Sequence, residues 1–324
     1  MFRNLTIFAI LLALFVVVLG AYVRLSDAGL GCPDWPGCYG SLIVDESHEG
    51  VAHAAEHYPE RPLEVSKAWK EMIHRYFASG LGLVILILTI MAWRRPELGQ
   101  RGLTTLLLLL VMFQGALGMW TVTLLVKPAI VMSHLLGGLA TLSLLLLLLL
   151  RIQTKRLAQT DKKNTVRSVT SVALLVLVVQ IALGGWTSTN YAALACPDFP
   201  TCFGTSWNPA VNYKEGFVLW RGLGVDYEFG VLSNEARAAI HWVHRIGALI
   251  TTILFSFLIY LLIRLSAIKE AIMLSALLFM QVMLGILNVL LNLPLHVAVA
   301  HNAVAALLLL SVVYVRFRLG KPVL

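Results

Sequence analysis

Eight long apolar stretches constrain this chain more than any other feature of its sequence. Each is about 20 residues long, which is the length an α-helix needs to cross the hydrocarbon core of a bilayer. They lie near residues 5–24, 72–93, 103–125, 129–150, 168–190, 238–263, 271–292 and 296–315. We therefore expect an all-α polytopic membrane protein with eight transmembrane helices.

The composition supports this fold class. Of the 324 residues, 59% are hydrophobic and 13% are charged, whereas soluble domains have about 45–50% apolar and about 25% charged residues. This excludes soluble enzymes, DNA-binding proteins and secreted disulfide scaffolds. The net charge of +8 does not indicate a nucleic-acid partner, because membrane proteins keep Lys and Arg at their cytoplasmic edges. The lipid bilayer is the expected partner.

The distribution of charge predicts the orientation of the chain. Basic residues collect in the connections after the second, fourth and sixth stretches and near both ends of the chain. Two long loops on the opposite face, residues 25–71 and 191–237, contain most of the acidic residues. Basic loops stay in the cytoplasm, so both termini are predicted to be cytoplasmic. The protein itself is expected in the cell (inner) membrane. The long loops then lie on the outer, periplasmic side, where cysteines can oxidise.

An internal repeat divides the chain into two halves. Residues 32–40, CPDWPGCYG, recur as CPDFPTCFG at residues 196–204. The other repeated positions are His74-Arg75 and His244-Arg245, His134 and His301, and Gln114-x3-Gly118 and Gln281-x3-Gly285. Each repeat has an even number of apolar stretches, which predicts parallel repeats. We expect two four-helix bundles, residues 1–152 and 168–324, joined by a cytoplasmic linker at 153–167.

The repeat also decides how the first apolar stretch is interpreted. That stretch follows Arg3 and, taken alone, resembles a signal peptide. Its counterpart ends at Gly184 as the first ends at Gly20, and a segment in the middle of the chain cannot be a signal peptide. We therefore interpret the first stretch as a membrane helix.

Four repeat-related histidines are the strongest functional candidates: His74, His134, His244 and His301. Ionisable residues within membrane spans are costly and mark functional sites. The second and fourth helices of each bundle can bring one histidine each to a shared interior. Two facing imidazoles without further ligands fit haem iron better than zinc. We expect one bis-histidine haem site per half; the alternative is that each histidine snorkels or bonds a carbonyl.

The two halves differ at one informative position. Glu71 precedes His74 by three residues, whereas His241 stands at the equivalent place before His244. Residues at i and i+3 share a helix face, so Glu71 is expected to face whatever His74 binds. A carboxylate there can take a proton or stabilise positive charge, which predicts reaction in the first half and electron storage in the second. The alternative for Glu71 is a charge at a helix N-terminus.

Arg75 and Arg245 directly follow two of the candidate histidines. At the water boundary an arginine can hold a haem propionate; the alternative is an interfacial anchor. His241 is a second candidate ligand in its half, although the spacing favours His244. The histidines without a repeat partner are expected on the surface of the outer loop: His48, His53 and His57.

Each outer loop contains a Cys-x5-Cys pair. The spacing alone fits a disulfide, a metal clip or a redox thiol pair. The oxidising side of the membrane favours disulfides, Cys32–Cys38 and Cys196–Cys202. A redox-active dithiol is the main alternative.

Together these residues resemble the heme A synthase family, in its two-cysteine-pair type. The resemblance rests on the segments RLSDAGLGCPDWPGC at 24–38, EMIHR at 71–75, Ser133-His134, the second CPDFP loop, Val243-His244-Arg245 and Ala300-His301-Asn302. It covers nearly the whole chain. Members of this family make haem A for terminal oxidases.

The resemblance implies an oxidoreductase that converts the C8 methyl group of haem O to a formyl group through successive hydroxylations. It implies that His244 and His301 ligate a resident haem b, that His74 and His134 receive haem O, and that Glu71 assists the oxidation. Haem O synthase and oxidase assembly factors are candidate partners, and a homo-oligomer is compatible with the sequence.

Two other functions use part of the same residues. A quinone-linked membrane thiol oxidase needs the cysteines but not all four histidines. A non-catalytic di-haem b-type electron carrier needs the histidines but has no use for a carboxylate in only one half. A transporter fits least, since no span is broken by Pro or by a Gly pair at mid-membrane in both halves.

Overall fold

The computed structural model describes residues 1–153, 162–204, 207 and 209–320 of the chain. Within these residues the secondary structure is helical and contains no strand. The helices are α1 (Phe2–Leu25), α2 (His48–His57), α3 (Val65–Arg94), the short 3-10 helix η1 (Pro96–Leu98), α4 (Arg101–Thr123), α5 (Pro128–Gln153), α6 (Lys162–Thr189), α7 (Tyr213–Gly216), α8 (Asn234–Arg264), α9 (Ile268–Leu290) and α10 (Leu295–Arg318).

Eight of these helices are long and apolar enough to span a bilayer, which confirms the prediction of a multi-pass membrane protein. The first apolar stretch is α1, which packs inside the helical assembly against α3, α5 and α10. Three spanning helices begin clearly earlier than the hydropathy predicts, because their first turns are polar: α3 starts at Val65, α6 at Lys162 and α8 at Asn234. The start of α6 takes in the last part of the predicted linker, and α8 is capped by Ser233, whose side chain accepts from Ala236 N–H. Most of the predicted linker, residues 154–161, lies outside the described residues.

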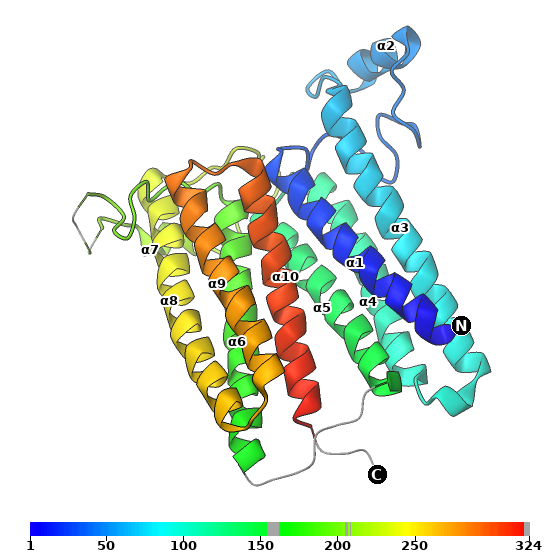
Figure 1. Ribbon diagram of the computed structural model, residues 1–324. Helices are drawn as coiled ribbons and strands as arrows, with labels where there is room; N and C mark the ends of the chain where they lie inside the picture. Colours follow the sequence, from blue (N-terminus) through cyan, green and yellow to red (C-terminus); the bar gives the residue numbers. More distant parts are fainter. Residues whose placement is uncertain (154–161, 205–206, 208, 321–324) are drawn as a thin grey trace.

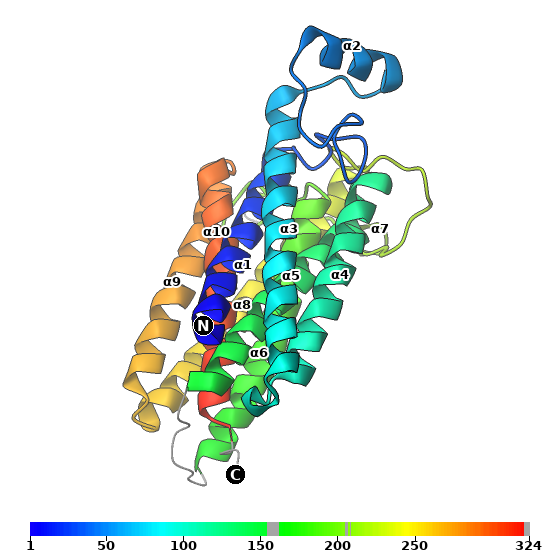
Figure 2. The ribbon, with the colours of Figure 1, turned by 90° about the vertical axis from the view of Figure 1, so that its right-hand side faces the viewer.

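Each half of the chain packs its helices in the same order. In the first half α1 packs against α3, α3 against α4, and α4 against α5; in the second half α6, α8, α9 and α10 do the same. The halves meet where α1 contacts α10, α5 contacts α6, and α5 contacts α10. Figures 1 and 2 show these two sets side by side, with the Phe2 end of α1 and the Arg318 end of α10 away from the α2 and α7 loops.

The apolar core is concentrated at one end of the helices. Its fully buried members come from the parts of the helices farthest from the long loops: Ile85, Leu88, Leu107, Leu142, Leu145, Leu148, Phe255, Leu258, Leu262 and Leu274. Large aliphatic side chains fill this end and hold the helices together. The histidines and several glycines occupy the other end, below the loops, and this leaves room for a cavity there.

Both predicted disulfides are confirmed. The structure joins Cys32 to Cys38 and Cys196 to Cys202, and leaves no cysteine free within the described residues. The two long loops are also tied to each other, because Arg61 in the first loop forms ion pairs with Asp226 (2.5 Å) and Glu228 (2.8 Å) in the second.

Candidate functional site

A cavity of about 620 Å³ lies among α1, α3, α4 and α5. Cofactor and small-molecule sites span about 300–1,000 Å³, so this space is large enough for a sizeable ligand. Its walls are mostly apolar, and the ionisable residues that line it are Arg24, Glu71, His74, Arg75 and His134. Two helices, α3 and α5, therefore bring together the histidine pair and the carboxylate that the sequence singled out for the first half.

His74 and His134 are accommodated by glycines on neighbouring helices. A Cβ placed on Gly20 of α1 would stand 2.9 Å from His74 Cε1, and one on Gly118 of α4 would stand 3.5 Å from His134 Cε1. The Nδ1 atoms of both rings are buried without a hydrogen-bond partner. Buried polar atoms of native proteins are nearly always satisfied, which indicates that these rings await a ligand or water.

The second half repeats this arrangement with one addition. A Cβ on Gly184 of α6 or on Gly285 of α9 would stand 3.2 Å from the Cε1 atom of His244 or His301. Here glutamine amides also contact the rings. Gln180 Nε2 lies 3.0 Å from His244 Nδ1, and the amide nitrogen of Gln281 lies 3.2 Å from His301 Nε2.

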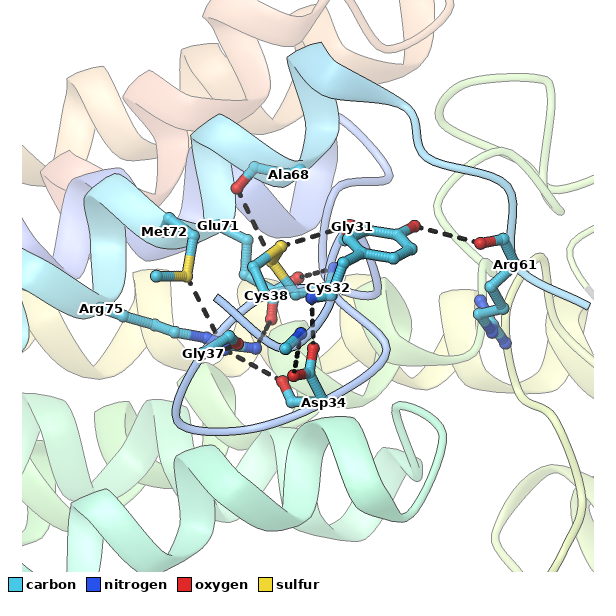
Figure 3. The surroundings of a disulfide bond; sticks show 12 residues. Gly31, Cys32, Asp34, Gly37, Cys38, Arg61, Ala68, Glu71, Met72 and Arg75 are labelled. Carbon is cyan, nitrogen blue, oxygen red and sulfur yellow. Dashed lines mark hydrogen bonds and ion pairs between the residues drawn. A yellow bond between two sulfur atoms is a disulfide. The ribbon is translucent and has the colours of Figure 1, made fainter. Parts of the chain in front are cut away.

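Glu71 and His241 occupy the same structural position in the two halves. Glu71 is 5% exposed; its Oε2 accepts from the main-chain N–H of Cys32 at 2.9 Å, and its Oε1 accepts from Arg75 at 2.5 Å. Figure 3 shows this carboxylate between the disulfide loop and the arginine. His241 Nδ1 faces Cys196 N–H at 3.2 Å, and its Nε2 faces Arg245 Nε at 3.2 Å.

The chemistry at this shared position differs. Two carboxylate oxygens accept from both donors, whereas a neutral imidazole has one acceptor nitrogen. Glu71 also lines the cavity below. His241 has both ring nitrogens directed at the loop and at Arg245, which supports His244 over His241 as the ligand in the second half.

The arginines that follow the candidate histidines hold the disulfide loops. Arg75 Nη1 donates to the carbonyl oxygens of Asp34 (3.1 Å), Pro36 (3.2 Å) and Gly37. Arg245 donates in the same way to the carbonyl oxygens of Cys196 (2.7 Å), Asp198 (2.6 Å) and Thr201 (2.7 Å). These contacts to loop carbonyls were not foreseen from the sequence; contact of either arginine with a propionate stays a prediction.

Arg24 is a cavity residue that the sequence analysis did not single out. Its Nη2 donates to Ser188 O at 2.8 Å and its Nη1 to the Tyr191 hydroxyl at 3.1 Å, while its Nε is buried without a partner. Those acceptors belong to the second half, so the cavity reaches the boundary between the halves. The repeat could have identified Arg24. The offset that relates the two Cys loops aligns Arg24 with Ser188, so the arginine is present in one half only.

The other candidate ligands lie elsewhere. His48, His53 and His57 are exposed on α2, as expected. Among the described residues no group of three or more His, Cys, Asp or Glu side chains is arranged to hold a metal ion, which leaves the metal-clip alternative for the Cys loops without support.

Comparison with known proteins agrees with this geometry. The family model of cytochrome oxidase assembly proteins (COX15-CtaA) matches residues 3–313. A heme A synthase of Shewanella oneidensis is 48% identical over 306 residues, which cover 94% of this chain and 92% of that protein. The chain belongs to the heme A synthase family. More distant relatives are also heme A synthases: that of Rhizorhabdus wittichii is 28% identical, covering 95% of this chain and 90% of that protein, and that of Halalkalibacterium halodurans is 27% identical, covering 99% of each.

Proposed function

We propose that this chain is a heme A synthase, an oxidoreductase that converts the C8 methyl group of haem O to a formyl group. In the half-reaction the methyl carbon gains one oxygen from water and releases four protons and four electrons. The cavity is the observation that carries the proposal, because it combines two histidines and one carboxylate with apolar walls large enough for a porphyrin. Family membership supports the same reaction.

In this proposal His74 and His134 hold the iron of haem O from α3 and α5. Both side chains line the cavity, and each has a buried Nδ1 without a partner. Arg24 supports the propionate groups, because its guanidinium lines the cavity and keeps one unpaired N–H. A guanidinium pairs well with a carboxylate in such a partly buried place.

Glu71 is the proposed catalytic group. Oxidation of the methyl group builds positive charge on carbon as electrons leave, and a buried carboxylate stabilises such charge more than a neutral imidazole does. Glu71 is fixed by Cys32 N–H and Arg75, so it is positioned before the substrate arrives. Because His241 occupies the equivalent place between the loop and Arg245 in the second half, that place does not by itself require a carboxylate.

We propose that His244 and His301 hold a resident haem b. The glycines opposite both rings leave space for them, and the buried Nδ1 of His301 lacks a partner, so the residues fit a bis-histidine haem. When bound, haem b would supply a one-electron acceptor. The glutamines beside these rings would orient them, as partners of metal-bound imidazoles commonly do.

The competing functions are less well supported. In a thiol oxidase the sulfurs must reach substrate proteins, but all four cysteines are at most 1% exposed. In a simple electron carrier Glu71 would have no task beyond the loop contacts that His241 also makes. Haem O synthase, oxidase assembly factors, a second copy of the chain and the periplasmic placement of the loops remain part of the proposal.

The haem content of single-histidine variants tests the two sites. The protein is purified in detergent, and its haems are extracted and identified by chromatography. Haem B together with haem O or haem A is expected for the unaltered chain. His301→Ala should lose haem B, whereas His134→Ala should keep haem B and lose haem O and haem A. A chain without any haem would contradict the proposal.

A further inference from the structure

The cavity wall reaches the lipid-facing surface between α3 and α4. Of the residues that line the cavity, several in the middle of these two helices are themselves exposed: Ser79, Leu83 (58% exposed) and Leu86 (39%) on α3, and Met112 (65%) and Gly115 on α4. Figure 2 shows α3 and α4 next to each other on the side away from α9 and α10. The cavity is therefore bounded here by side chains that also face the bilayer.

We propose that this opening between α3 and α4, the lateral portal, receives the isoprenoid tail of the haem substrate from the membrane. The inference rests on the proposed function. Leu83 lies nine residues beyond His74, about 14 Å along the helix, so the portal reaches from the level of the iron ligands toward the middle of the bilayer. Its residues are apolar or small, which suits a hydrocarbon chain rather than a polar head group. Haem O carries such a chain, a farnesyl-derived tail, on its ring.

The second half provides an internal comparison. Gly82 of α3 also lines the cavity beside the portal. At three cavity-lining positions of α3 and α4, small side chains of the first half are replaced by larger ones in the second: Ser79 by Leu249, Gly82 by Thr252, and Gly115 by Val282. The second bundle, which is proposed to keep its haem b, thus has larger side chains at these positions than the first bundle, which is proposed to exchange haem O. One turn deeper the order reverses, since Leu86 corresponds to Ser256, so the difference is confined to the level just below the iron ligands.

The two portal glycines allow a clean test. A Cβ on Gly82 or Gly115 would have no neighbour within 4 Å, and glycine is a poor helix former, so larger side chains are compatible with the fold. The variant Gly82→Thr/Gly115→Val carries the residues of the second half. The matched control is Gly80→Thr/Gly102→Val on the same helices. A Cβ on either of these glycines also has no neighbour within 4 Å, and neither glycine lines the cavity.

Binding of tailed and tailless haem separates the portal from the rest of the site. Protein with its resident haem is reconstituted in lipid nanodiscs and titrated with haem O or with haem B, and the second haem bound is followed by its absorption. Each displaced methylene of the tail costs about fourfold in affinity, so the portal variant should bind haem O about tenfold or more weakly. Its affinity for haem B, and both affinities of the control variant, should be unchanged.

The alternatives give different results. Unaltered haem O affinity in the portal variant would overturn the portal, and so would an equal loss for haem B, which would mean a general disturbance of the site. If lipid acyl chains were the true occupants, mass spectrometry would show altered co-purified lipid with unaltered haem O affinity. Failure of the unaltered chain to bind haem O would overturn the proposed function itself. That outcome differs from failure of the portal alone, in which the unaltered chain still binds haem O.

Discussion

At the scale of single residues, the internal repeat separates the structural from the chemical role of Glu71. The side chain has a structural task, since it accepts from Cys32 N–H and pairs with Arg75. The equivalent His241 faces the corresponding donors of the second half, Cys196 N–H and Arg245, with a side chain that is not a carboxylate. Glu71 and His241 therefore occupy equivalent positions but differ in chemistry, and the carboxylate is what distinguishes the first half.

Two substitutions at Glu71 should separate these roles. Glu71→Ala leaves the buried Cys32 N–H without an acceptor and Arg75 without its counter-charge, and this should lower the stability by about 1–3 kcal/mol. Glu71→Gln keeps an acceptor oxygen and should lower it less, yet slow haem A formation by about 100-fold or more, as loss of a charged catalytic group does. Thermal unfolding in detergent and product chromatography measure the two effects. Equal activity of Glu71→Gln and the unaltered chain would remove the charge from the mechanism.

The glycines opposite the histidines give a second prediction at this scale. In Gly20→Ala the new methyl group would stand 2.9 Å from His74 Cε1, so the ring must move. Gly118→Ala is a matched control, because its methyl group would stand at an ordinary contact distance of 3.5 Å from His134. We expect Gly20→Ala to lose most of its haem O and Gly118→Ala to retain it, measured as haem per protein after extraction. Equal retention would show that the close approach of Gly20 and His74 has no bearing on the ligand.

At the scale of secondary-structure elements, the membrane helices could be predicted and their ends could not. Twenty-residue apolar runs specify spanning helices because the bilayer accepts little else. Hydropathy does not register the polar first turns of α3 and α8, and the predicted stretch at 72–93 therefore leaves out Glu71, which α3 carries in its second turn. The repeat predicted which histidines belong together. It did not predict that Arg75 and Arg245 hold the loops, since those contacts are to main-chain oxygens, which a pattern of side chains does not reveal.

The disulfide loops are expected to affect the two sites differently. Closing a loop of this length contributes about 2 kcal/mol in the chain-entropy account. Cys32→Ser/Cys38→Ser should lower thermal stability by that amount and slow haem A formation, because the loop presents the Cys32 N–H that fixes Glu71. Cys196→Ser/Cys202→Ser should lower stability similarly and leave the haem O site intact. An identical loss of haem O conversion in both double variants would contradict this difference.

At the scale of the whole molecule, the two halves cooperate at one boundary. Arg24 of α1 reaches Ser188 O and the Tyr191 hydroxyl in the second half, and Arg61 joins the outer loops through Asp226 and Glu228. Residues of α6 and α10 also line the cavity: Gly185, Ser188, Thr189 and Asn302. The site of the first half is therefore completed by the second.

Arg24 tests this boundary. Arg24→Gln removes the positive charge and the unpaired Nε–H at the cavity wall, and should weaken retention of haem O while the haem B of the second half stays bound. Arg24→Lys keeps the charge but not the planar guanidinium. Its retention of haem O is expected to lie between that of Arg24→Gln and that of the unaltered chain. Chromatography of extracted haems gives both quantities in one run. Full retention of haem O by Arg24→Gln would exclude Arg24 as a propionate partner.

The most direct measurement is the fate of haem O in membranes that contain either the unaltered chain or Glu71→Gln. Membranes with the unaltered chain should accumulate haem A, and those with Glu71→Gln should contain the protein with haem B and haem O bound but form haem A about 100-fold or more slowly. Formation of haem A by Glu71→Gln at the rate of the unaltered chain, or its absence with the unaltered chain while haem O is bound, would contradict the claim that this cavity oxidises haem O with Glu71 as its catalytic group.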